Sequence, residues 1–219
     1  TALPDALLCA HHGSTSCFLE IPAARFRMGA QAIDPAAPGY DPDALASEGP
    51  VHEVAVSTFF LQRNEVTVGQ YERCLKSGWC DEGTVLRAPG ANLLTPERRD
   101  HPMNFVSWHG AQRFCARLGG RLPTEAEWEL AARGTDGRRF PWGDEPGCGT
   151  GHEDPTAAWS KVMERAPCRH TGTSHPSDLR GDSPYGVQGM AANVWEWTSD
   201  TWAEDAYAHH APVDPEGPT

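Results

Sequence analysis

Residues 120–134, with the sequence GRLPTEAEWELAARG, constrain the fold more than any other segment because they specify both ends of a helix. Thr124 is the expected N-cap, and Glu127 can return a hydrogen bond to the Thr124 amide, which would close a capping box. Gly134 can adopt the left-handed conformation that ends a helix. The apolar positions at i, i+3 and i+4 are Trp128, Ala131 and Ala132. Their spacing predicts a helix with one buried face.

Capping residues also mark two earlier helices. Thr67 and Gln70 predict a second capping box, in a helix that ends at Gly78. Ser107 is the expected cap of another helix, which ends at Gly119. The side chains expected to be buried are Tyr71, Cys74 and Leu75 in the first of these helices, and Trp108, Ala111, Cys115 and Leu118 in the second.

Alternating apolar and polar residues predict strands at 18–21, 24–28 and 52–60. In the last of these, Val54, Val56 and Thr58 are expected to share one face. The chain contains 22 Gly and 19 Pro without a repeat, so turns and long ordered loops should make up much of the structure. A hydrophobic fraction of 39%, with eight Trp, is enough for one core. We therefore expect a single α+β domain with little regular secondary structure.

The charge balance excludes two classes of partner. Thirty acidic side chains against eighteen basic ones give a formal net charge of -12, which repels nucleic acid and anionic membrane surfaces. No run of 18 apolar residues occurs, so membrane insertion is not expected. The N-terminus has no basic region followed by an apolar stretch, so any signal peptide is expected to have been removed already.

Six of the seven cysteines fall into local pairs. The predicted disulfides are Cys9 with Cys17, Cys74 with Cys80, and Cys148 with Cys168. Each pair flanks a loop that a crosslink would restrict. Cys115 lies within a predicted helix and is expected to be reduced and buried. The pairing favours an extracytoplasmic protein, in the periplasm, at the cell surface or secreted, over a cytosolic protein with incidental thiols. Residues 1–20 are then an N-terminal lead pinned by a disulfide, and residues 21–219 the domain.

Six segments in order resemble the formylglycine-generating enzyme (sulfatase-modifying factor) family. They are Phe26-Arg-Met-Gly29, Asn64-Glu-Val-Thr67, residues 102–108 (PMNFVSW), residues 120–134, residues 140–145 (FPWGDE) and residues 193–200 (NVWEWTSD). The resemblance implies the α+β, C-type-lectin-like fold of that family, which is poor in regular secondary structure. The chain resembles this fold without its C-terminal segment.

The resemblance also implies a structural calcium site. Position by position, Ala192 and Val194 would supply carbonyl oxygens and Glu196 a carboxylate, whereas the family's asparagine ligand corresponds to Gly189. Water can replace such a missing oxygen at some cost in affinity. The alternative is that Glu196 caps local amides and that Trp195 and Trp197 belong to the core.

No catalytic residue is assigned. Enzymes of this family oxidise a cysteine of a sulfatase peptide with O2 and a copper ion, held by two cysteines four residues apart beyond the Trp-Glu-Trp motif. None of the seven cysteines here has that spacing to another, and no phosphate-binding loop, His-Glu-x-x-His or Gly-x-Ser-x-Gly motif occurs. We expect a non-catalytic extracytoplasmic binding or structural module, with a protein or peptide on its loop surface and carbohydrate as an alternative ligand. The competing hypothesis is a copper-dependent formylglycine-generating oxidase whose catalytic cysteines lie beyond residue 219.

Overall fold

The computed structural model describes residues 18–144, 183–191 and 193–218. Two antiparallel strand pairs form two small sheets, in which β1 (Phe18–Ile21) pairs with β4 (Phe59–Gln62) and β2 (Ala24–Met28) pairs with β3 (His52–Val56). Within the described residues the helices are α1 (Val68–Lys76), α2 (Trp108–Arg117), α3 (Glu125–Arg133) and the short α5 (Ala206–His209). The loops of the same ranges contain four 3-10 turns: η2 (Ala46–Glu48), η3 (Glu82–Thr84), η4 (Asn92–Leu94) and η5 (Pro96–Arg98).

The strand predicted at 52–60 is two strands. Val54 and Val56 are buried, as expected, but β3 ends at Val56 and β4 begins at Phe59. Thr58 is exposed in the turn between them, where its hydroxyl accepts a hydrogen bond from the Ala23 amide at 3.0 Å. The turn lets one continuous segment supply a strand to each of the two sheets.

The ends of α3 agree with the sequence-based prediction. Thr124 and Glu127 form the capping box, with the Thr124 amide donating to Glu127 at 2.8 Å. Gly134 ends the helix with a positive φ of 68°, but its ψ of -148° differs from that of the expected left-handed helical conformation. Arg121 also pairs with Glu127 at 2.6 Å, which fixes the chain just before the helix. The apolar face is broader than expected, because the buried residues include Ala126 and Leu130 together with Ala131 and Ala132, whereas Trp128 is only partly buried.

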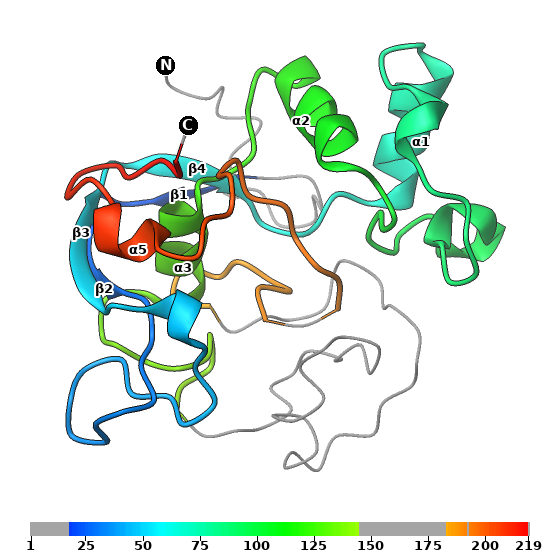
Figure 1. The fold of residues 1–219 in the computed structure, drawn as a ribbon. Helices are drawn as coiled ribbons and strands as arrows, with labels where there is room; N and C mark the ends of the chain where they lie inside the picture. Colours follow the sequence, from blue (N-terminus) through cyan, green and yellow to red (C-terminus); the bar gives the residue numbers. More distant parts are fainter. Residues whose placement is uncertain (1–17, 145–182, 192, 219) are drawn as a thin grey trace.

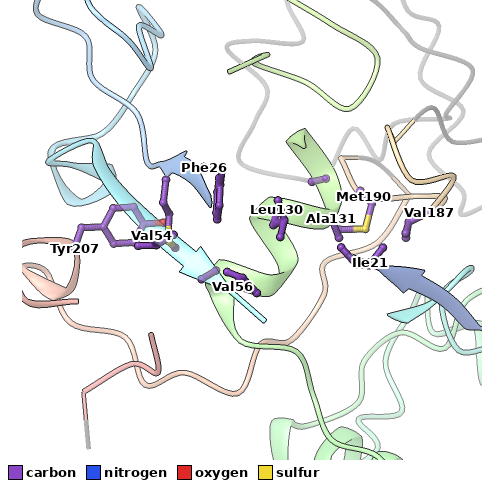
Figure 2. Close-up of a cluster of buried hydrophobic side chains, with 12 residues drawn as sticks. Ile21, Phe26, Val54, Val56, Leu130, Ala131, Val187, Met190 and Tyr207 are labelled. Atoms are coloured by element: carbon purple, nitrogen blue, oxygen red, sulfur yellow. The ribbon is translucent and has the colours of Figure 1, made fainter. Parts of the chain in front are cut away.

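The main core surrounds α3. Figure 2 shows Leu130 and Ala131 between side chains of β2 and β3 on one side and Val187, Met190 and Ile21 on the other. The hydroxyl of Ser183 donates to the carbonyl of Ala131, which holds the start of the 183–191 segment against the helix. α3 therefore joins the strands to the segment that leads into the Asn193–Asp200 motif.

A second apolar cluster lies between α1 and α2, which occupy the side of Figure 1 away from α3. The ring of Tyr71 in α1 stacks on Phe114 in α2 with centroids 5.4 Å apart. The predicted stripe of α2 is confirmed only in part, because Trp108, Ala111 and Cys115 are partly buried and Leu118 is exposed, whereas the fully buried residues of the helix are Gly110 and Phe114. A Cβ on Gly110 would lie 2.7 Å from the Thr84 hydroxyl, so this glycine allows α2 to approach Thr84 closely. The close approach places the side of α2 that carries Gly110 against the neighbouring loop.

The Cys74–Cys80 disulfide is present, with an S–S distance of 2.00 Å, and it clamps the end of α1. Cys115 is free, as expected, but only partly buried; burial nevertheless raises the pKa of its thiol. The predicted Cys9–Cys17 and Cys148–Cys168 pairs lie outside the described residues. In the ranges that are described, no helix combines the length and apolarity needed to cross a membrane.

The core position of Leu130 gives a test of this arrangement. Leu130 is 0% exposed, so Leu130→Ala should lower the free energy of unfolding by about 2–5 kcal/mol, through lost burial and the cavity left behind. The matched control is Leu118→Ala, because Leu118 is 62% exposed and its truncation should change stability by no more than about 0.5 kcal/mol. Chemical denaturation measures both. A larger loss for Leu118→Ala than for Leu130→Ala would contradict the packing described here.

Candidate functional site

Two loops from distant parts of the chain meet beside the main core. The Gln188 amide donates to the Arg63 carbonyl at 2.8 Å, and the Asn64 side-chain amide donates to that of Gln188 at 2.6 Å. Both side chains are buried, so these bonds hold residues 63–65 firmly against residues 187–189. The contact places the next residue, Glu65, in the interior.

Glu65 is a buried carboxylate without a cationic neighbour in its described surroundings. Its Oε1 accepts a hydrogen bond from the side-chain amide of Asn193 at 2.9 Å. Burial raises the pKa of Glu65, and the bond from Asn193 only partly opposes that shift. Asn193 adopts a left-handed φ of 73°, a conformation that asparagine tolerates better than most residues and that turns its amide toward Glu65.

Gly189 explains how the Glu65 carboxylate fits. A Cβ at position 189 would lie 2.2 Å from Glu65 Oε1, so a side chain there would collide with the carboxylate. Gly189 also has a φ of 80°, which favours glycine. The carboxylate of Glu65 therefore occupies the space next to the Gly189 backbone that a side chain would need.

Glu196 adds a second carboxylate to the same place. Glu196 as a whole residue is partly exposed, but its carboxylate is enclosed and accepts a hydrogen bond from the Trp128 indole of α3 at 2.6 Å. Burial, with a further contribution from the charge of Glu65, raises the pKa of Glu196 to about 8. Two enclosed carboxylates that disfavour each other's ionisation are a site where a cation would be stabilised.

The structure brings together only part of the predicted metal set. Ala192 lies outside the described residues, Val194 is partly buried, and Glu196 reaches the interior next to Glu65. Sequence reasoning missed Glu65, although it lies in one of the motifs used for recognition. Within the described ranges, no group of three or more His, Cys, Asp or Glu side chains could hold a metal ion. A cation at the Glu65–Glu196 pair would therefore need backbone or water oxygens as well.

Exposed aromatic side chains lie on the other side of the same motif. We call Phe105, Trp197 and the adjoining Leu86 the aromatic surface. The Trp197 indole donates to the Val106 carbonyl at 2.9 Å, and the Leu86 amide donates to the Phe105 carbonyl at 2.8 Å. Trp197 is 49% exposed and Phe105 is 42% exposed, so the alternative interpretation of Trp197 as a core residue is wrong.

The aromatic surface is held in a fixed arrangement. Trp108 of α2 donates its indole N–H to the Thr198 carbonyl at 2.7 Å, which ties the residue after Trp197 to the helix that follows Phe105. Phe105 itself has a φ of 56°, a sparsely populated conformation for a bulky residue. Backbone strain of this kind persists where the surrounding structure over-determines it, and it clusters at binding and catalytic sites.

Comparison with known proteins defines the family. The model of the sulfatase-modifying factor enzyme 1-like domain matches residues 10–215. Formylglycine-generating enzyme from Thermomonospora curvata is 34% identical over 90% of this chain and 77% of its own length. Inactive C-alpha-formylglycine-generating enzyme 2 from Bos taurus is 28% identical over 87% of this chain and 73% of its own length. The chain therefore belongs to the sulfatase-modifying factor enzyme 1-like domain family.

A solved structure has the same fold. PvdO from Pseudomonas aeruginosa superposes with a TM-score of 0.64 and 25% identity, over 91% of this chain and 76% of that one. The fold predicted from the sequence, an α+β formylglycine-generating-enzyme fold with small sheets and few helices, is confirmed.

The raised pKa of Glu196 gives a pH-dependence of stability. Without calcium, the folded protein holds a proton on Glu196 that the unfolded chain releases above its ordinary pKa of 4.5. The free energy of unfolding should therefore fall as pH rises from about 4.5 to about 8. Glu196→Gln keeps a neutral side chain at every pH, so its free energy of unfolding should change less across this range than that of the wild type. Thermal melts in chelator across this range measure it.

The control for this experiment is Glu204→Gln, which removes an exposed carboxylate from the same region of the chain. Glu204→Gln should retain the wild-type dependence of the free energy of unfolding on pH. Identical pH profiles for wild type and Glu196→Gln would show that Glu196 is not enclosed in solution.

Proposed function

We propose that this chain is a non-catalytic binding module of the sulfatase-modifying factor fold, and that its ligand is a polypeptide segment bound at the aromatic surface. The observation that carries the proposal is that Phe105 and Trp197 are exposed and at the same time fixed by their surroundings. Rigid exposed aromatic side chains supply much of the binding energy at protein interfaces, because little conformational entropy is lost when they are covered.

The cysteine chemistry supports binding without turnover. Copper-dependent oxidation in this family requires two closely placed thiolates, and soft thiolate ligands are what Cu(I) selects. Cys74 and Cys80 are bonded to each other, and burial keeps Cys115 in its thiol form by raising its pKa. A relative of similar coverage carries the name of an inactive formylglycine-generating enzyme, so a non-catalytic member would have a precedent.

A second candidate function is the copper-dependent oxidation of a cysteine in a sulfatase-type peptide. It is favoured by the relatives named formylglycine-generating enzyme. In that case the catalytic cysteines would belong to a segment beyond residue 219, and copper would be a cofactor of that longer protein. The aromatic surface would then present the peptide to the copper.

We further propose an extracytoplasmic location and a structural calcium ion. The Cys74–Cys80 disulfide favours an oxidising compartment. For calcium, the carboxylates of Glu65 and Glu196 fit a hard cation that prefers oxygen ligands. Backbone carbonyls of Ala192 and Val194 would complete the set, and Glu65 would take the place of the family asparagine at Gly189. Bound calcium would neutralise two carboxylates that otherwise destabilise each other.

Calcium should raise the melting temperature of the wild-type protein at pH 8. At a calcium concentration about one hundred times the dissociation constant, the stabilisation should be about 2.7 kcal/mol. Glu65→Gln and Glu196→Gln should each abolish most of this effect, whereas Glu204→Gln should retain it. Scanning calorimetry with and without chelator measures the shift. A calcium effect of equal size in all four proteins would place the ion elsewhere.

The binding proposal is tested with peptides selected against the chain from a random display library. Trp197→Ala should weaken their binding about thirtyfold, equivalent to about 2 kcal/mol, because it removes a central aromatic contact. Leu45→Ala, which truncates an exposed apolar side chain before η2, should leave binding unchanged. Titration calorimetry gives the two constants. Equal binding by Trp197→Ala and wild type would remove the aromatic surface from the proposal.

The same preparation tests whether residues 1–219 are themselves catalytic. The chain is incubated with copper, O2 and a sulfatase-motif peptide, and mass spectrometry follows the cysteine of the peptide. We expect no aldehyde above a control without protein. Aldehyde formation would favour the oxidase and show that residues 1–219 contain the copper ligands.

A further inference from the structure

Two histidines join the C-terminal segment to the sheet. His52 is the first residue of β3 and His210 follows α5, and their facing ring atoms, His52 Nε2 and His210 Nδ1, are 3.1 Å apart. The ring of Tyr207, in α5, lies against both, with centroids 5.4 Å from His52 and 5.0 Å from His210. Neither histidine belongs to the carboxylate site or to the aromatic surface.

The contacts of the pair define where its protons lie. His52 Nδ1 is 2.9 Å from the Pro50 carbonyl, which can only accept, so this nitrogen carries a hydrogen. In the neutral ring His52 Nε2 is then an acceptor, and His210 Nδ1 must be the donor. This leaves His210 Nε2 with a lone pair, and that atom is buried without a hydrogen-bond partner in the described structure.

One added proton disrupts this arrangement whichever nitrogen receives it. A proton on His210 Nε2 creates a buried charged donor that has no acceptor, which is costly. A proton on His52 Nε2 places two N–H groups face to face, unless His210 changes tautomer. That change moves its hydrogen to Nε2 and leaves the same unpaired donor. The neutral pair is thus the form that the fold accommodates.

We propose that His52 and His210 form an acid-sensitive latch that releases residues 206–214 from β3 when the pair is protonated. The segment is also held by the Tyr207 hydroxyl, which donates to Glu125 at 2.9 Å, and by hydrogen bonds to β3 and Ser57. Along the outer edge of β3, the Ala55 amide donates to Pro212 at 2.9 Å and the Asp214 amide donates to Ala55 at 2.8 Å. Asp214 also accepts from the amide and hydroxyl of Ser57, at 2.6 and 2.7 Å.

The charges around the latch act in both directions. Burial and the neighbouring His52 lower the pKa of His210, while Asp200, in the loop before α5, opposes this shift. On α5, His209 pairs with Asp205 at the surface, and on β3 Glu53 pairs with Arg25. Around Tyr207, the nearby carboxylates are Glu48, Glu125 and Glu129, the last of them paired with Arg133. The net direction for His210 is toward the neutral form.

The lowered pKa of His210 determines how the stability of the latch changes with pH. A histidine whose folded pKa lies below its ordinary value of 6.5 stabilises the latched form above that value and loses this stabilisation as pH falls through it. Release would uncover Tyr207, which is buried, and would leave the Ala55 amide and carbonyl unpaired. An uncovered strand edge of this kind is a template for pairing with another chain.

Hydrogen exchange tests the latch directly. Protection factors of the Ala55 and Asp214 amides, corrected for intrinsic exchange, are compared at pH 7.5 and pH 5.0, with the amides of the β1–β4 pair as internal reference. Because pH 5.0 lies about 1.5 units below the ordinary histidine pKa, protection should fall by a few-fold up to about thirtyfold. In His210→Gln this fall should disappear, whereas His209→Gln, at an exposed position one residue earlier, should retain it.

Two results would overturn the proposal. One is an equal fall in wild type and His210→Gln, and the other is no fall in wild type relative to β1 and β4. If His210→Gln does not fold, NMR titration of the wild-type imidazoles decides instead. Titration of His210 at or above the ordinary value would exclude the latch, and titration below it supports the latch.

Discussion

Glu129 places a carboxylate inside the protein, and the elements around it depend on the contacts that satisfy it. Its Oε1 accepts the Gly29 amide at 2.9 Å and pairs with Arg133 one turn later in α3. Arg133 also donates to the carbonyls of Gly29, at 3.3 Å, and Arg138, at 2.7 Å. Burial raises the pKa of Glu129 despite Arg133, so its carboxylate is costly to leave unpaired. The end of β2, the helix and the turn beyond it must therefore be in place together.

The apolar cluster between α1 and α2 is connected to the main core by a small number of hydrogen bonds. α1 and α2 share their own apolar residues, and the Cys74–Cys80 disulfide closes that part of the chain. What connects this cluster to the main core is the pairing of residues 63–65 with residues 187–189, together with the indole bonds of Trp108 and Trp197. The carboxylate pair and the aromatic surface lie where those connections are made.

Local signals in the sequence predicted the helix ends, because a capping box and a terminating glycine act within one turn. The burial of α2 could not be predicted in the same way. Its apolar spacing placed Leu118 inside, but the stacking of Phe114 on Tyr71 and the close approach at Gly110 decide which face is covered. These are contacts between segments, and helical periodicity alone does not contain them.

The candidate site shows the same division. Glu196 could be placed by resemblance, whereas Glu65 could not, because its carboxylate fits beside Gly189, which lies 124 positions further along the chain. Gly189 was interpreted as the loss of a metal ligand. In the structure the absence of its side chain is what admits the Glu65 carboxylate, which in the proposed calcium site would supply an oxygen from a different loop.

The two halves of the proposed site are coupled by the direction of three consecutive side chains. In segment 195–197, Glu196 turns its carboxylate inward while Trp195 and Trp197 remain exposed. Because the three residues are consecutive, a contact that holds the Glu196 side chain also constrains the backbone from which its two neighbours project. A cation bound between Glu65 and Glu196 would let both carboxylates ionise and would tie residue 196 to residue 65. It would thereby hold Trp197 in the position from which its indole reaches the Val106 carbonyl and its ring faces solvent.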